Sequence, residues 1–228
     1  MSKETMMNGE KATRSITDEA YEFIFQKIVN CEYPPGYELN AKEIVNETGF
    51  GITPVRESLL ILQKAGMLSI RPHKGIIITP ITERRTREHF QIRRLIEPTI
   101  MVENCHIYSK QKLYEFSEMF EKDYELTDYE RFTQDIRFHK YLMSVVNNRR
   151  LEEIYEDILA SQIRSAVYEA LHNPDKHKGE NIRQHQMIID MLLKENRQGI
   201  HDAIMYHLSY SENNILRVLK QEADGGKP

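Results

Sequence analysis

Two kinds of hydrophobic spacing divide the chain. Up to about residue 80, short apolar runs alternate with turn signals such as Pro34-Pro35-Gly36 and Gly49-Phe50-Gly51. After that point, apolar residues recur every three or four positions over long stretches, and no glycine occurs before Gly179. Because this spacing puts apolar residues on one face of a helix, it predicts an antiparallel helical bundle. We place the boundary between the two parts at residues 79–82.

The first part is expected to begin with three helices. Apolar residues at helical spacing predict a first helix to about residue 30, with Thr17 as its N-cap. A short second helix is expected over residues 41–48. Thr53 is a suitable N-cap for a third helix that runs to about residue 64, with Pro54 as its first residue.

A β-hairpin is expected to follow the third helix. The β-prone runs at residues 67–71 and 75–80 lie on either side of the turn sequence Pro72-His73-Lys74-Gly75. Three helices followed by a hairpin is the order of a winged helix-turn-helix domain, which binds DNA. A small α+β domain without that role has the same order, so the pattern alone leaves both open.

The second part is expected to be all α, which makes the chain mainly α. Its hydrophobic stripes and breaks predict six helices, at residues 82–108, 110–126, 128–146, 148–171, 179–195 and 198–221. We therefore expect two domains, one with the winged helix-turn-helix order over residues 1–80 and a helical one over residues 81–222. Residues 1–15 and 223–228 are expected to be disordered.

Composition and charge exclude several classes of protein. Of the 228 residues, 40% are apolar and 29% are charged, and the formal net charge is −4. The chain is therefore no polycation, although residues 40–80 carry five Lys/Arg against three Asp/Glu, a net of +2. No apolar run approaches the roughly 18–20 residues of a membrane span, and the N-terminus has no apolar signal core. Because Cys31 and Cys105 suggest no disulfide framework, we expect a cytoplasmic protein.

Two features of the first part are suited to DNA. The third helix begins with free backbone N–H groups and carries Arg56 in its first turn, a combination that binds a phosphate or a guanine edge. His73 and Lys74 lie at the predicted hairpin tip beside Gly75, where the backbone can approach a groove closely. A solvated, charged tip is the alternative interpretation of His73 and Lys74.

The same segments resemble a known family. The string Tyr33-Pro34-Pro35-Gly36-Tyr37-Glu38-Leu39, the segment Lys42-Glu43-Ile44 and the string Thr53-Pro54-Val55-Arg56-Glu57-Ser58-Leu59 resemble the N-terminal domain of GntR-type bacterial transcription regulators. The second part is similar to the FCD-type effector domain of the FadR subfamily. The resemblance covers residues 17–219 and implies a homodimer with two winged heads on a pseudo-palindromic operator in double-stranded DNA.

The resemblance also implies which residues contact the operator. By position, they are Lys42, Gly51, Ile52, Thr53, Arg56, His73, Lys74 and Gly75. The sequence departs from the family at Gly51-Ile52, where a Ser/Thr-Arg pair is usual. Because isoleucine cannot donate a hydrogen bond to a base, we expect a different operator preference or more phosphate-driven binding. Leu60 and Ile61 stand where polar residues are usual, so we expect that face to pack on another domain or subunit.

Four residues of the second part could bind one metal ion. Asp135 and His139 are four residues apart and share a helix face. His185 and His207 lie at nearly equal distances from the turn near Arg197, so an antiparallel hairpin brings them to one level. This set suits zinc above all, or nickel or manganese. Spacing alone is equally met by ordinary hydrogen-bonded pairs, but the resemblance supports the metal, because all four match the Asp-x3-His…His…His pattern of the metal-containing FCD branch.

A metal ion with open coordination sites would bind a small carboxylate, such as an organic acid or a sugar acid. Arg93 and Arg164 are the candidates to hold the other end of that effector, although Arg93 could instead pair with Glu97 four residues later. We therefore expect a ligand-responsive regulator, acting as a repressor, and no enzyme. Two alternatives remain open: a sensor for which the metal itself is the signal, and a metal-dependent hydrolase, which would leave the winged head unexplained.

Overall fold

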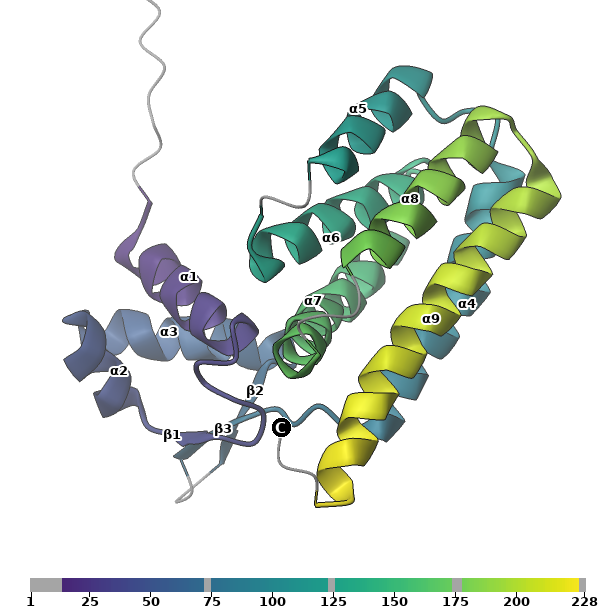
Figure 1. The fold of residues 1–228 in the computed structure, drawn as a ribbon. Helices are drawn as coiled ribbons and strands as arrows, with labels where there is room; N and C mark the ends of the chain where they lie inside the picture. The colour runs from purple at the N-terminus through teal and green to yellow at the C-terminus, as the bar shows by residue number, and fades with distance from the viewer. Residues whose placement is uncertain (1–13, 72–74, 123–125, 174–177, 226–228) are drawn as a thin grey trace, which may run out of the picture.

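The computed structural model describes residues 14–71, 75–122, 126–173 and 178–225. They form a small head, residues 14–82, beside a larger helical bundle, residues 83–225 (Figure 1). The mainly α fold predicted from the sequence is confirmed. Most of the two ends expected to be disordered lies outside the described residues. Ala223, which was expected in the tail, is the last residue of the final helix.

The head contains three helices and three short strands, in the order α1 (Ile16–Val29), β1 (Glu38–Leu39), α2 (Ala41–Thr48), α3 (Ile52–Lys64), β2 (Leu68–Arg71) and β3 (Gly75–Ile78). The strands form one antiparallel sheet in the order β1-β3-β2. The hairpin prediction is confirmed, whereas β1 was not predicted, because a two-residue strand has no period. Gly75 begins β3 at a φ of +79°, and a Cβ there would lie 3.0 Å from the carbonyl oxygen of Leu39.

The two predicted N-caps of the head were wrong by two residues each. α1 begins with a capping box in which Ser15 Oγ accepts from the Asp18 N–H and the Asp18 carboxylate accepts from the Ser15 N–H. Thr17 therefore lies inside the helix and donates to Glu57 Oε2 at 2.8 Å. α3 is capped by Gly51, and Pro54 is its third residue. A proline fits there because the first N–H groups of a helix have no intrahelical acceptor.

The bundle consists of the six predicted helices, with shifted ends: α4 (Glu83–Glu103), α5 (Lys110–Glu121), α6 (Asp128–Ser144), α7 (Arg149–His172), α8 (Lys178–Leu193) and α9 (Arg197–Ala223). α4 and α9 lie side by side over most of their length (Figure 1). Phe90, Phe138 and Leu208 are fully buried in the core that these helices share. Among the described residues, no helix is long and apolar enough to cross a membrane.

α7 belongs to both cores. Ile163 and Val167 pack into the core of the head, against residues such as Ile24 and Ile28 of α1. The N-terminal half of α7 lies in the bundle, where Tyr155 and Leu159 join its core. α7 therefore contributes side chains to the cores of both parts.

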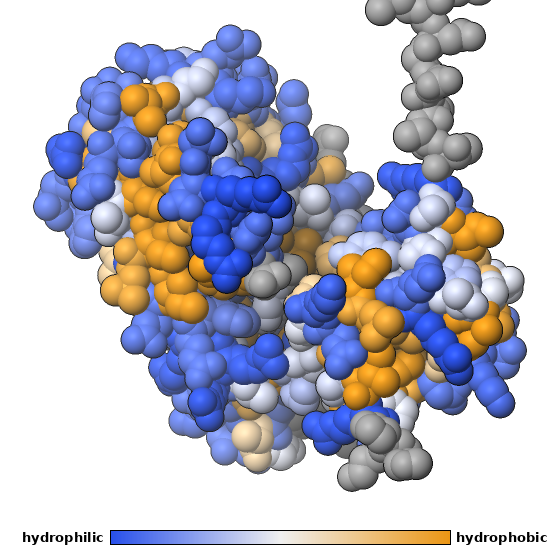
Figure 2. Space-filling view, turned by 180° about the vertical axis from the view of Figure 1, so that it is seen from behind, coloured by the Kyte–Doolittle hydropathy of each residue, from blue (hydrophilic) through white to orange (hydrophobic). Residues whose placement is uncertain are grey.

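Hydrophobic side chains gather on one face of the molecule, over both the head and the bundle (Figure 2). On the head, Leu60 and Ile61 have exposed fractions of 55% and 47%. Leu60 lines a shallow apolar groove together with Ile70 and Ile76. Within the described part of the chain, this face is therefore not covered by another domain, and packing on a second subunit stays a prediction.

Candidate metal centre

The four predicted metal ligands converge in the bundle. Asp135 and His139 lie one turn apart on α6, His185 lies on α8 and His207 on α9. One potential ligand atom of each residue lies within 4.8 Å of those of the other three. The antiparallel packing of α8 and α9 brings His185 and His207 to one level, and their rings lie 4.7 Å apart. Sequence spacing therefore identified a real cluster.

The distances within the cluster are those of groups that face a common point. Asp135 Oδ1 lies 2.7 Å from His185 Nε2 and 3.6 Å from His139 Nε2. The Nε2 atoms of His139 and His207 are 3.2 Å apart. The three histidines are buried, and the Asp135 side chain is about one-fifth exposed, with a relative accessibility of 19%. The cluster is therefore shielded from water while one carboxylate remains at its rim.

The outer nitrogens of two histidines have oxygen partners. His139 Nδ1 lies 3.0 Å from Glu97 Oε2, and His207 Nδ1 lies 3.1 Å from Gln184 Oε1. Such oxygens can accept a hydrogen bond from Nδ1–H, which leaves the Nε2 lone pairs directed inward, an arrangement found around protein metal sites. Two lone pairs facing each other across 3.2 Å repel unless a proton or a cation lies between them.

Glu97 is held as an anion by its surroundings. Burial by itself would raise its pKa, but the charge of Arg93 prevails and keeps the pKa of Glu97 well below its usual value. Arg93 Nε and the Tyr155 hydroxyl both donate to Glu97 Oε1, each at 2.5 Å. All these side chains are buried. A fixed negative charge therefore stands behind His139.

Burial also controls the charge of the histidines. It lowers the pKa of His207 well below its usual value, aided by the neighbouring His185 and His139, and it lowers the pKa of His185. Burial acts in the same direction on His139, but the Glu97 carboxylate outweighs it and raises the pKa of His139. His185 and His207 are thus neutral, as metal ligands must be, and a metal would replace one proton on His139.

The donor set fits a borderline divalent metal ion. Two imidazole nitrogens bound at about 2.1 Å, with about 90–110° between them, lie about 3.0–3.4 Å apart, in agreement with the His139–His207 distance. Three nitrogens and one carboxylate oxygen suit zinc, nickel or manganese better than calcium or magnesium, which prefer oxygen ligands alone. His185 Nε2 is buried and lies 2.7 Å from Asp135 Oδ1, so these two potential ligand atoms face the same point.

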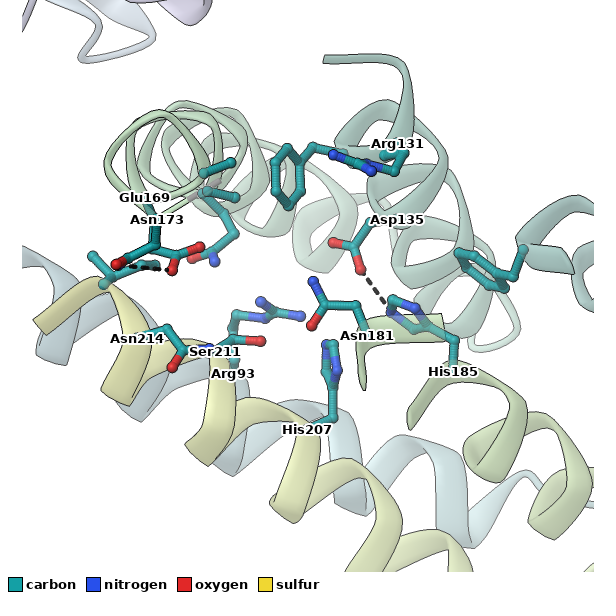
Figure 3. Close-up of a pocket in the computed structure, with 16 residues that line it drawn as sticks. Arg93, Arg131, Asp135, Glu169, Asn173, Asn181, His185, His207, Ser211 and Asn214 are labelled. Atoms are coloured by element: carbon teal, nitrogen blue, oxygen red, sulfur yellow. Dashed lines mark hydrogen bonds and ion pairs between the residues drawn. The ribbon is translucent and has the colours of Figure 1, made fainter. Parts of the chain in front are cut away.

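A pocket opens beside the cluster (Figure 3). Arg93, Asp135, His185 and His207 line one part of it. Arg93 was predicted either to hold the effector or to pair with Glu97. In the structure it lines the pocket and also pairs with Glu97. Arg164 does not line the pocket. It lies on another face of α7, and its Nη1 donates to the carbonyl oxygen of Met67 in the head at 3.4 Å. Its role in holding the effector stays a prediction.

The predicted DNA-contacting residues lie on the head. Lys42 is exposed on α2, and Ile52, Thr53 and Arg56 are exposed in the first turns of α3. Gly51 is the N-cap of α3, so the positive end of this helix is directed to solvent. Gly75 is half-buried at the start of β3. His73 and Lys74, which were also predicted to contact DNA, lie outside the residues that the structure describes.

Several residues of the site were not predicted from the sequence. Gln184 and Tyr155 support the histidines and Glu97, but their contacts come from elements far apart in the chain. A larger group lines the rest of the pocket: Arg131, Gln162, Glu169, Asn173, Asn181, Ser211 and Asn214. The only available signal was helical spacing, since Asn181 precedes His185 by four residues and Ser211 follows His207 by four.

Comparisons with known proteins identify both parts. Residues 16–78 match the family described as bacterial regulatory proteins, gntR family, and residues 88–210 match the FCD domain. The HTH-type transcriptional repressor RspR of Escherichia coli K12 is 22% identical over 232 residues, which cover 98% of each chain. The HTH-type transcriptional regulator YdhC of Bacillus subtilis 168 is 24% identical and covers 88% of this chain and 91% of its own.

Solved structures show the same fold. A GntR transcriptional regulator from Rhodococcus sp. RHA1 has a TM-score of 0.76 at 20% identity, over 89% of this chain and 98% of its own. McbR of E. coli has a TM-score of 0.71 at 20% identity, and the match covers 92% of this chain and 100% of the McbR chain. The two matched families are families of regulators, and they give the hydrolase alternative no support. The chain belongs to the GntR family of bacterial regulatory proteins and is a DNA-binding transcription regulator with an FCD domain.

Proposed function

We propose that the protein is a homodimeric repressor whose bundle binds a divalent metal, with zinc preferred, and through it a small carboxylate effector. The observation that carries the proposal is the convergence of Asp135, His139, His185 and His207, with two of the outer nitrogens held by Glu97 and Gln184. Arg93 beside the cluster adds a positive charge for an anionic ligand. The repressor RspR of E. coli, similar over the whole chain, supports the direction of the response.

The packing of α7 supports coupling between the bundle and the head. Gln162 and Glu169 of this helix line the pocket, while Ile163 and Val167 pack into the core of the head. An effector that binds more tightly to one position of α7 would favour one position of the head, which is what allosteric control of operator binding requires. Arg164 acts here as a positioning residue through its bond to the Met67 carbonyl oxygen.

The metal is tested by analysis of the purified protein after dialysis against trace zinc. We expect about one zinc ion per chain in the wild type and a large loss in His185→Ala, because one of four ligands is removed. His201→Ala is the matched control, since His201 is a half-exposed histidine on α9 that is absent from the cluster. Equal zinc content in the wild type and His185→Ala would contradict the proposal.

The metal-sensor alternative is tested by titrating zinc against operator affinity. The polar pocket beside the cluster favours a ligand-holding metal, because a sensor site has no need of a second set of recognition groups. We therefore expect the metal-loaded protein to respond to small carboxylates at constant, saturating zinc. If operator affinity followed the zinc concentration alone and no acid changed it, the metal would itself be the signal.

The operator is identified by selecting bound fragments of genomic DNA with and without candidate acids. Two heads related by two-fold symmetry should select pseudo-palindromic sites. Ile52 is exposed at the start of α3, where it can contact a thymine methyl group but cannot pair with guanine. Fragments without any two-fold repeat would contradict the proposed dimer.

A further inference from the structure

A second group of cationic side chains lies where the head meets the bundle. Arg164 Nη1 donates to the carbonyl oxygen of Met67 at 3.4 Å, and Arg85 Nη2 lies 3.7 Å from the position that a Cβ of Gly66 would occupy. Both guanidinium groups therefore reach the same turn, which follows α3. His89 stands one helical turn after Arg85 on α4, and we call Arg85, His89 and Arg164 the junction cluster.

Arg164 is the buried member of the junction cluster. Its exposed fraction is 2%, and its Nε finds no hydrogen-bond partner among the described residues. The Met67 carbonyl oxygen already accepts from the Thr79 N–H at 3.0 Å, so the longer bond from Nη1 offsets little of the hydration that the guanidinium loses. Burial accordingly lowers the pKa of Arg164 to about 10, and the charge of Arg85 acts in the same direction. A buried cation therefore retains an N–H donor without an acceptor.

Within the described part of the chain, no counter-ion neutralises the two arginines of the junction cluster. The Arg84 guanidinium pairs with Glu88 at 2.8 Å, whereas no carboxylate pairs with Arg85 or Arg164. The Cys31 thiol interacts with Arg164, but burial raises the pKa of this thiol to about 11. The thiol is therefore neutral at physiological pH and supplies no negative charge.

The same face of α4 holds an arginine whose charge is balanced. Arg93 follows His89 by four residues and pairs with Glu97 at 2.5 Å. One turn earlier no such partner exists among the described residues. Burial lowers the pKa of His89, and the charges of Arg85 and Arg164 add to this effect. The junction cluster therefore carries an unbalanced positive charge, which a bound anion would balance.

Completion of the end of α3 does not explain these arginines. In the turn after the helix, the N–H groups of residues 65–67 already donate to carbonyl oxygens of residues 61–63. Arginines near a helix C-terminus often bond to such carbonyls, but here these acceptors have backbone donors. A capping role therefore leaves both Arg85 and the Nε of Arg164 without a function.

The operator backbone is too far away to supply the anion. α3 begins on the side of the head away from the bundle and ends beside α7 (Figure 1). At a rise of 1.5 Å per residue, its 13 residues correspond to about 20 Å, so a phosphate held near Arg56 does not reach the junction cluster. A small anion from solution does, because Arg85 is exposed and His89 is half-buried.

We propose that Arg85, His89 and Arg164 bind a tetrahedral oxyanion, either free phosphate or the phosphate group of a monoester, at the junction of the head and the bundle. The two arginines supply charge and N–H donors in a fork, and His89 supplies one further N–H group. A phosphate directs oxygens toward donors on several sides. A phosphate monoester carries a charge of about −1.5 to −2 at pH 7, which balances two guanidinium groups better than one carboxylate does.

The bound anion would connect α4 and α7 with the turn after α3 and would thereby fix the head against the bundle. This inference does not depend on the proposed metal or on its effector, because Arg85, His89 and Arg164 do not line the pocket beside the metal cluster.

Calorimetric titration of the full chain with inorganic phosphate tests the site. We expect one phosphate per chain, with equal affinity in the presence of one equivalent of zinc and after treatment with a chelator. Arg85→Ala should lower the affinity about 3- to 10-fold and Arg164→Gln at least about 10-fold, because each removes a charged hydrogen bond. Arg84→Ala is the matched control: it removes an exposed arginine that already pairs with Glu88 and should leave the affinity unchanged.

Thermal unfolding separates a binding role of Arg164 from a structural one. Phosphate should raise the unfolding temperature of the wild type, compared with chloride at equal ionic strength, but not that of Arg164→Gln. Without phosphate, Arg164→Gln should unfold at the wild-type temperature or above it, because it removes a buried charge that has no counter-ion. If Arg164→Gln folds poorly, Arg85→Ala at its exposed position carries the test.

Equal phosphate affinities of the wild type, Arg85→Ala and Arg164→Gln would overturn the inference. Phosphate binding that requires zinc would do the same, as would tighter binding of acetate than of phosphate. A titration with glycerol 3-phosphate distinguishes the two sources of the anion. Tighter binding of this ester than of inorganic phosphate would assign the site to a phosphorylated metabolite, and weaker binding would assign it to free phosphate.

Discussion

The head and the bundle use polar residues in opposite ways. In the described part of the head, the buried polar residues are Ser58 and Thr79, while Lys42, Ile52 and Arg56 are exposed. In the bundle, the candidate site is built from buried groups: Arg93, Glu97, His139, Glu169, His185 and His207. The predicted DNA-contacting residues of the head therefore lie outside an ordinary apolar core, whereas the candidate site of the bundle lies inside it.

This difference has an energetic consequence. An exposed arginine loses little hydration on folding, whereas each buried ion loses several kcal/mol of hydration that its partners have to offset. The head can therefore change its DNA-contacting residues at little cost in stability. The bundle is tied to its polar interior, and we expect a bound metal or effector to stabilise it by mass action.

The strongest test of this comparison uses two Arg-Glu pairs on α4 with the same four-residue spacing. The Arg93–Glu97 side chains are 1% and 0% exposed, and the Arg84–Glu88 side chains are 87% and 50% exposed. Glu97→Ala should lower the free energy of unfolding by about 3–5 kcal/mol, because it leaves a buried arginine without its partner. Glu88→Ala should change it by no more than about 0.5 kcal/mol. Urea denaturation of both variants measures the difference.

If both substitutions had a similarly small effect on the free energy of unfolding, the expected difference between the buried and the exposed pair would be contradicted. It would mean that water or a rearranged neighbour compensates for the buried charge of Arg93. The double variant Arg93→Met with Glu97→Met sharpens the test, because removing both charges should restore part of the lost stability. Its zinc content should nevertheless fall, since His139 loses the carboxylate that fixes its ring.

The fold and the metal cluster were predictable because they depend on periodic patterns. Helical spacing located all six bundle helices, and counting from the turn near Arg197 placed His185 and His207 at one level. The helix starts were less accurate. Thr17 and Thr53 are good caps in isolation, but Ser15 forms a complete capping box, and Pro54 is tolerated in the third position of α3.

The rest of the site could not be predicted, because it depends on which helix faces are opposed. Glu169 and Asn214 look like ordinary solvent-exposed residues in sequence and become buried only when α7 and α9 pack. The position of Arg164 shows the same dependence on the helix face. It lies two positions after the pocket residue Gln162, and a shift of two positions in a helix turns a side chain by about 200°, toward the head. The identity of a residue gave no information on this rotation.

The pH dependence of stability gives the next largest effect. Burial raises the pKa of Glu169 from 4.5 to about 7, so the folded chain holds this proton more tightly than the unfolded chain. The contribution of Glu169 to stability is therefore complete below the unfolded pKa and is lost as the pH rises through the folded pKa. Between about pH 5 and about pH 8, Glu169→Gln should gain up to about 3 kcal/mol relative to the wild type.

Thermal or urea unfolding of the metal-free proteins at several pH values measures this gain. The exposed Glu153 on the same helix is the control, because Glu153→Gln should show no such trend. A wild-type curve parallel to that of Glu169→Gln would show that the carboxyl is well hydrated. The part of the pocket around Glu169 would then resemble the surface of the head in this respect.

Arg56 tests the other side of the comparison. Arg56→Ala should weaken specific operator binding by about 1–3 kcal/mol if its guanidinium contacts a base. Because Arg56 is exposed, the free energy of unfolding should stay within about 0.5 kcal/mol of the wild type. Lys64→Ala, in the last turn of the same helix, is the control for non-specific charge effects. An unchanged operator affinity, measured by fluorescence anisotropy, would remove Arg56 from the DNA-contacting set.

The smallest effect comes from one exposed N-cap in each region. Ser15 Oγ accepts from the Asp18 N–H in the head, and Asn148 Oδ1 accepts from the Leu151 N–H at 3.1 Å in the bundle. Ser15→Ala and Asn148→Ala should each lower stability by about 1 kcal/mol, since both remove the same kind of bond at a solvated helix end. If the two variants lost equal amounts of stability, exposed polar groups would contribute equally in the head and in the bundle, and the two regions would differ only in their buried polar groups. A much larger cost for Asn148→Ala would instead indicate that α7, which joins the two cores, is under added strain.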